Sequence, residues 1–136
     1  MTARKSGISV KYNDAVPVIA CLDVRAAVDY YVRVLEFREH FVFGEPAVYA
    51  GVERDGIILY LTLNAEFVAL PKHARLHPEV FFWVEKVDEV FKEHKRRGAT
   101  IVEDISDRAW DARQYVIEDP SGYHLKIAEP LDHIGR

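Results

Sequence analysis

The sequence has a single cysteine and no long uninterrupted apolar run. The lone thiol, Cys21, cannot form an internal disulfide, and its apolar surroundings are typical of a small buried hydrophobe. No segment approaches the roughly 18 apolar residues that a membrane-spanning helix needs. The N-terminal stretch MTARKSGISVKY has no apolar core of the kind found in secretory signals. We therefore expect a soluble, cytoplasmic protein that does not bind membranes.

Positive charge is also scarce, because 18 lysines and arginines face 22 acidic residues and the formal net charge is −4. The densest basic stretch, His94–Arg97, falls at the end of an expected helix, where cations complement the helix dipole. No basic stripe of the kind that binds phosphate backbones is present, so nucleic acid is not an expected partner. Hydrophobic residues make up 49% of the chain, which is enough for a packed core.

Several catalytic signatures are missing as well. There is no glycine-rich phosphate loop, and no serine or cysteine has an evident histidine and acid to activate it. His73 and His77 have the spacing of a zinc-protease helix, but Ala74 stands where that motif has glutamate. We interpret them as surface histidines in a linker, and we interpret Asp119-Pro120 as part of a turn.

The first half of the chain contains the pattern of a strand, a helix and further strands. Residues 16–22 are apolar enough for a buried strand, and Asp23 is a candidate N-cap for a helix that follows. Residues 49–52 and 57–63 alternate as strands do, with Asp55-Gly56 as the hairpin turn between them.

The second half repeats this order. Residues 79–84 predict a strand, the apolar spacing from Val87 to His94 predicts a helix, and strands at 114–117 and 123–127 flank an Asp-Pro-Ser-Gly turn. A shift of 63 residues aligns the opening strands and helices. A shift of 66 aligns the closing strands, taking Tyr49 to Tyr115 and Tyr60 to Lys126.

The repeat predicts an α+β fold of two tandem βαβββ modules, the first over residues 14–70 and the second over residues 76–130. In each module the second strand is the weakest in the sequence, near 39–43 and 101–105. The segment 64–78 links the modules.

Alternation along the best strands separates two faces. One face is entirely apolar and should lie against the helices. The other face, called the mixed face below, combines aromatic, charged and small residues: Val16, Val18, Ala20, Ile58, Tyr60, Thr62, Glu79, Phe81, Trp83, His124 and Lys126. An antiparallel sheet can leave such a face in solvent. The large aromatics favour a small-molecule pocket or a subunit interface instead.

Two stretches carry a family resemblance. The segments VPVIACLDVRAAVDYYVRVLEF and WDARQYVIEDPSGYHLKI resemble the opening and closing parts of the vicinal oxygen chelate superfamily, which includes glyoxalase I, extradiol dioxygenases and bleomycin resistance proteins. The second stretch has the form of the bleomycin-resistance-like branch, and the resemblance covers about residues 14–130. It implies mixed sheets that curl around a central cavity, and a homodimer.

The enzymes of that superfamily bind a divalent metal at four strand positions, which the resemblance places here at Val16, Tyr60, Glu79 and Lys126. Valine has no donor atom and lysine is a cation, so only Glu79 is an ordinary ligand for a hard metal. We therefore expect no metal and no cofactor. We expect Lys126 to form an ion pair with Glu79 instead.

These observations favour a metal-free protein that sequesters an aromatic or glycopeptide-type antibiotic in a dimer groove. The alternative is a metal-dependent enzyme of the glyoxalase or dioxygenase type, in which Glu79 has unusual partners. Whether Trp110 lines the groove or the subunit interface stays open. The candidate ligand-binding residues are Tyr60, Glu79, Phe81, Trp83, Trp110, Arg113, His124 and Lys126.

Overall fold

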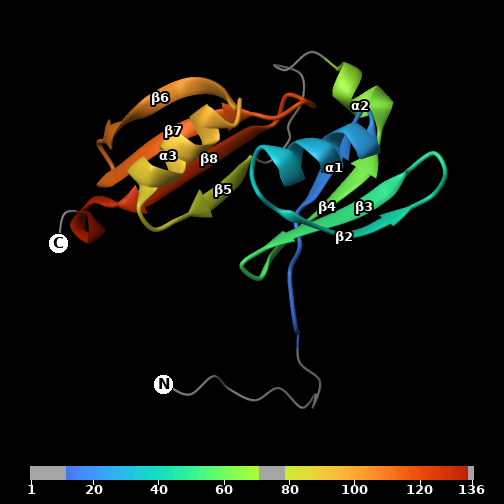
Figure 1. Ribbon diagram of the computed structural model, residues 1–136, viewed down its shortest axis with the longest axis horizontal. Helices are drawn as coiled ribbons and strands as arrows, with labels where there is room; N and C mark the ends of the chain where they lie inside the picture. The colour runs from blue at the N-terminus through green and yellow to red at the C-terminus, as the bar shows by residue number, and fades with distance from the viewer. Residues whose placement is uncertain (1–11, 71–78, 135–136) are drawn as a thin grey trace.

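The computed structural model describes residues 12–70 and 79–134, and within them the chain forms two modules that lie side by side (Figure 1). The first module consists of β1 (Val18–Cys21), α1 (Val24–Arg33), β2 (Arg38–Phe43), β3 (Tyr49–Arg54) and β4 (Ile57–Leu63). The second module consists of β5 (Val80–Trp83), α3 (Val87–Arg96), β6 (Thr100–Arg108), β7 (Ala112–Glu118) and β8 (His124–Pro130). Two short helices were not expected: α2 (Ala65–Ala69) and a 3₁₀ turn (Leu131–His133).

The two sheets have the same topology. Strand order is β1-β4-β3-β2 in the first sheet and β5-β8-β7-β6 in the second. In each, the opening strand pairs in parallel with the closing strand, and the other pairs are antiparallel. The sheets stay separate and do not close into a barrel within the described chain. The predicted α+β fold of two tandem βαβββ modules is confirmed, although residues 76–78 of the expected second module lie outside the described residues.

Helices α1 and α3 each cover the apolar face of their own sheet (Figure 1). Helix α1 begins where the sequence predicts, because the Asp23 carboxylate accepts a hydrogen bond from the Ala26 amide at 3.0 Å. Val24, Val28 and Tyr31 recur on one side of this helix and are buried. No helix in the described part of the chain is long and apolar enough to cross a membrane.

The internal repeat needs one correction. The register pairs Ala50 with Leu61 and Tyr115 with Ile127, so Ala50, not Tyr49, is the counterpart of Tyr115. The offset for this strand is therefore 65 residues and not 66. A one-residue slip moves a side chain to the opposite face of a sheet. Tyr49 accordingly lies on the mixed face, whereas Tyr115 is fully buried under α3.

One core spans both modules, and the loop between β7 and β8 helps to join them. Asp119 in this loop accepts hydrogen bonds from the amides of Ser121 and Tyr123 at 2.9 Å each. It also accepts one from the hydroxyl of Tyr31, on α1 of the other module, at 2.9 Å. Burial raises the pKa of the Asp119 carboxyl, while these hydrogen bonds oppose that shift. The predicted turn is therefore also a tertiary contact.

Candidate functional site

The mixed face of the second module carries the ion pair that the sequence predicted. The register places Phe81 beside Lys126 and Lys126 beside Val116. The Lys126 ammonium lies 2.6 Å from a carboxylate oxygen of Glu79, and both side chains are about one-third exposed. An ion pair at this level of exposure contributes little to stability, typically 0–1 kcal/mol, so it is better suited to shaping a polar contact point.

His124 lies beside this pair. Its Nδ1 is 3.8 Å from an oxygen of Glu79, and its Nε2 is 3.5 Å from an oxygen of Glu118. Four charged or titratable groups therefore lie at one end of the second sheet: Glu79, Glu118, His124 and Lys126.

The other end of the same face is aromatic. Trp83 pairs with Ala128, which in turn pairs with Gln114, so these three side chains form a row across the sheet. The ring centroids of Phe81 and Trp83 are 4.8 Å apart, and the two side chains are 42% and 58% exposed. Trp110, in the turn before β7, donates from its indole nitrogen to the Gln114 amide oxygen at 3.2 Å. Trp110 therefore stands at the end of the row that Trp83 begins.

The mixed face of the first module is built from neutral aromatics. The rings of Phe41, Tyr49 and Tyr60 have centroids 5.6–6.0 Å apart in all three pairs. With neighbouring residues they line an open recess of about 820 Å³. Gly51 lies beneath the cluster, because a Cβ atom added there would come within 2.5 Å of the Phe41 ring. The glycine thus allows Phe41 to lie flat over the sheet.

Arg113 lies on the opposite side of the second sheet from the mixed face. It shares the face of Tyr115, where its guanidinium contacts Asp88 of α3 at 3.0 Å and Asp107 of β6 at 2.9 Å. We therefore leave Arg113 out of the candidate site. The other predicted residues of the second module are brought together on one face, and Tyr60 lies on the face of the first. His73 and His77 lie outside the described residues.

The four positions that hold a metal in the superfamily's enzymes do not suit one here. Lys126 is already bound to Glu79, and its ammonium would repel a divalent cation. Val16 offers no donor, and Tyr60 belongs to the neutral aromatic cluster of the other module. Within residues 12–70 and 79–134, no group of three histidine, cysteine or acidic side chains could hold a metal ion. We derive no metal chemistry from this set of donors.

Sequence reasoning missed Phe41, Tyr49 and Gln114. Tyr49 and Gln114 can be assigned to the mixed face once the register of β3 and β7 is known. Phe41 depends on an irregularity, since the pairing of β2 with β3 shifts between Glu39 and Phe41. Simple alternation counted from Glu39 places His40 opposite Gly51, whereas the structure places Phe41 there. No local sequence signal marks that bulge.

Known proteins share this architecture. The structure of TioX from Micromonospora sp. ML1 is 28% identical and superposes with a TM-score of 0.72, covering 88% of this chain and all of that one. A bleomycin-binding protein from Streptomyces verticillus, solved with copper(II)-bleomycin, is 24% identical, with a TM-score of 0.65 over 89% of this chain and 97% of its own. The latter likeness shows the fold.

Sequence comparison gives a consistent picture. An uncharacterized protein of Mycobacterium tuberculosis (strain ATCC 25618 / H37Rv) is 23% identical over 129 residues, which cover 87% of this chain and 75% of that protein. Residues 15–127 match the Glyoxalase/Bleomycin resistance protein/Dioxygenase superfamily across both modules. The chain therefore belongs to the Glyoxalase/Bleomycin resistance protein/Dioxygenase superfamily.

Proposed function

We propose that this protein binds a small planar molecule, without breaking a bond in it, in a groove between two copies of the chain. The observation that carries the proposal is a pair of aromatic clusters on the mixed faces, one in each module, exposed in the second module and half-buried in the first. Phe81 and Trp83 belong to the second, and Phe41, Tyr49 and Tyr60 belong to the first. Large aromatic side chains gathered on one face, with a few polar groups among them, are typical of ligand sites.

A second copy is the proposed cover for these faces. The first module presents neutral aromatics, whereas the second presents the Glu79–Lys126 pair beside Trp83. If the first module of one copy faces the second module of the other, each groove has an aromatic wall and a wall with both charges. A planar ligand can then stack on the rings while its polar edge reaches the ion pair. The superfamily resemblance also implies a dimer.

The proposed ligand class is an aromatic or glycopeptide-type antibiotic. Support comes from the shared fold, because solved proteins with this architecture include ones named as bleomycin-binding. In this proposal, Glu79 and Lys126 contact polar groups of the ligand. Trp83 and Trp110 stack on its rings. His124 would add a polar contact at the far end of the groove.

The experiment is a titration of the protein with metal-free bleomycin, followed by tryptophan fluorescence. We expect saturable quenching, and we expect Trp83→Ala and Trp110→Ala each to weaken binding roughly tenfold, since ~1.4 kcal/mol is a factor of ten. Neither variant should change the thermal midpoint noticeably, because both side chains are more than half exposed. Sedimentation should give twice the 15.6 kDa chain mass.

Two results would contradict the proposal. A clean monomer at micromolar concentration would remove the second wall of the groove. If Trp110→Ala dissociates the dimer while the affinity per folded dimer stays the same, Trp110 belongs to the interface and not to the binding surface. An unrelated planar compound, such as acridine, serves as the control for stacking without specific polar contacts.

A further inference from the structure

The closing hairpin turn of each module contacts the other module, and these two contacts differ. The turn of the second module, residues 119–123, packs against the first module. By the internal repeat, its counterpart is the turn at residues 54–57, which borders α3 and the end of β5. Three pairs of positions are equivalent in the two modules. Tyr31 corresponds to His94 at an offset of 63 residues, Arg54 to Asp119 at 65, and Ile57 to Tyr123 at 66.

The contact made by the longer turn is filled and fully hydrogen-bonded. The Tyr31 hydroxyl donates to the Asp119 carboxylate at 2.9 Å, and the Tyr123 hydroxyl accepts from the Ala20 amide at 3.3 Å. Tyr31, Asp119 and Tyr123 are all buried. Here the Asp119 carboxylate and the Tyr123 ring of the second module fill the contact with the first module.

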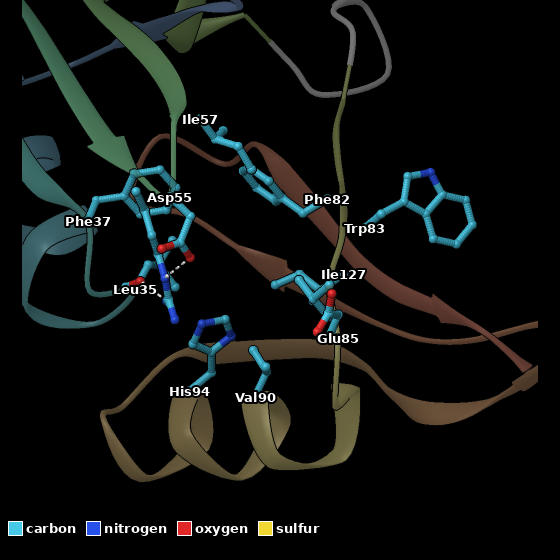
Figure 2. Close-up of a pocket in the computed structure, with 12 residues that line it drawn as sticks. Leu35, Phe37, Asp55, Ile57, Phe82, Trp83, Glu85, Val90, His94 and Ile127 are labelled. Carbon is cyan, nitrogen blue, oxygen red and sulfur yellow. Dashed lines mark hydrogen bonds and ion pairs between the residues drawn. The ribbon is translucent and has the colours of Figure 1, made fainter. Parts of the chain in front are cut away.

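The equivalent place beside the shorter turn is a cavity of about 470 Å³ (Figure 2). Ile57 is smaller than Tyr123, its counterpart in the filled contact, so it leaves space there. Arg54 is a cation, whereas its counterpart Asp119 is a hydrogen-bond acceptor. Figure 2 shows the His94 ring rising from α3 beneath Leu35, while the Trp83 ring points away from the others. The walls are mostly apolar: Leu35, Phe37, Ile57, Phe82, Val90 and Ile127.

His94 is one of the residues that line this cavity. The residue is 5% exposed, and its Nε2 is buried without a hydrogen-bond partner among the described residues. Its Nδ1 lies 2.7 Å from the Tyr115 hydroxyl. That contact is the only hydrogen bond of the buried Tyr115 hydroxyl within the described chain, so the phenol donates and Nδ1 accepts. In the neutral ring this leaves Nε2 as an N–H donor.

Arg54 provides a second donor group at the cavity. Its guanidinium bonds the Leu35 carbonyl at 2.7 Å and lies 3.6 Å from Asp55. Burial, followed by the nearby Arg54 charge, lowers the pKa of His94 to about 4, so the ring is neutral at ordinary pH. The carboxylate side chains of Asp55 and Glu85 also line the cavity, but both residues are exposed, so solvent screens their charges. Arg54 is the one cation among the described residues that line this cavity, and it stands where the equivalent contact has the Asp119 carboxylate.

We propose that this junction cavity binds a compact apolar carboxylate, whose charged group lies between Arg54 and His94 as Asp119 lies against Tyr31. The apolar body of the ligand takes the place that Tyr123 fills in the equivalent contact. The cavity volume falls within the range of small-molecule sites. The site differs from the proposed groove between copies, since its apolar walls belong to the helix-facing side of the sheets. Trp83 is the one groove residue that borders it, with its ring directed away (Figure 2).

The test uses phenylacetate as the probe and 2-phenylethanol, which lacks the carboxylate, as its matched control. Calorimetric titration of the full chain should show one phenylacetate site with a dissociation constant on the order of 1 mM. We expect 2-phenylethanol to bind at least about fivefold more weakly. Ile57→Tyr restores the side chain of the filled contact, so it should weaken phenylacetate binding at least about tenfold and leave the thermal midpoint unchanged or higher.

Two further variants isolate the donor. His94→Gln keeps an N–H near the position of Nε2, whereas His94→Leu removes it, and both lose the contact with Tyr115. We expect about fivefold weaker binding for His94→Leu than for His94→Gln, and no change for Lys126→Met on the opposite face. The proposal is overturned if phenylacetate does not saturate, if Ile57→Tyr binds it as tightly as the natural chain, or if Lys126→Met alone weakens it.

Discussion

The two modules have the same fold but differ on the face that their helices leave uncovered. The counterparts of Tyr60 and Val16 in the first module are Lys126 and Glu79 in the second. One module therefore presents an aromatic cluster over Gly51, and the other presents an ion pair beside two aromatic rings. The helix-facing sides stay apolar in both, because they hold the core. The comparison shows that the fold depends on one face of each sheet and leaves the other free to diverge.

The closing turns differ in the same way. The turn of the second module is one residue longer and carries Asp119, which accepts three hydrogen bonds across and within the modules. The turn of the first module is a two-residue Asp55-Gly56 hairpin in which both residues have positive φ. A longer turn with an inward acceptor fills its contact, and a tight turn leaves room for the junction cavity.

The largest difference is expected when each turn loses its principal side chain. Asp119→Ala leaves two backbone amides and the Tyr31 hydroxyl without their acceptor, so it should lower the free energy of unfolding by about 3 kcal/mol. Arg54→Ala loses a hydrogen bond to one carbonyl from a half-buried side chain, and it should cost about 1 kcal/mol. Urea unfolding of the two variants measures both values. Equal losses would mean that the turns contribute equally and that their difference has no energetic consequence.

A second prediction concerns His94 and its counterpart Tyr31, which should affect the pH dependence of stability differently. The folded pKa of His94 is about 4, below its ordinary value of 6.5, so the unfolded chain binds more protons between these two pH values. The stabilisation from a neutral His94 is therefore present above pH 6.5 and is lost as the pH falls toward 4. Between pH 7 and 5 this contribution should fall by about 2 kcal/mol.

Unfolding of the natural chain and of His94→Gln at the two pH values measures this contribution. The variant should lose less stability on acidification than the natural chain. The counterpart of His94 in the first module, Tyr31, has a pKa raised well above 10 by burial, so the Tyr31 phenol itself does not titrate between pH 5 and 7. Parallel slopes for the natural chain and His94→Gln would refute the assignment of the effect to His94.

The smallest expected effect concerns the mixed face of the first module. Gly51→Ala places a methyl group within 2.5 Å of the present position of the Phe41 ring, so that ring has to shift. We expect roughly threefold weaker binding of bleomycin and a stability change of less than about 1 kcal/mol. Val116→Ala changes the equivalent position of the second module and should leave affinity within twofold. If Gly51→Ala binds bleomycin as the natural chain does, the Phe41 ring is not part of the groove.

Much of this protein followed from periodicity alone. Alternation put Glu79 and Lys126 on one face, and the parallel pairing of β5 with β8 brings them together as an ion pair. The N-cap at Asp23 and the Asp55-Gly56 hairpin were also predictable, because capping and turn geometry depend on neighbouring residues. Local chemistry, helical apolar spacing and the two-residue alternation of strands thus determined the modules, their helices and most members of the mixed face.

Only the tertiary structure decided the positions that depend on register and on contacts between modules. The bulge before Phe41 and the 65-residue offset of β7 each move side chains from one face to the other, and no local pattern encodes them. Arg113 shows the consequence, since it turns toward Asp88 and away from the mixed face. The cavity beside His94 lies where the turn at residues 54–57 of the first module meets β5 and α3 of the second. Periodicity describes each strand by itself, whereas the shape of a site depends on how separate segments meet.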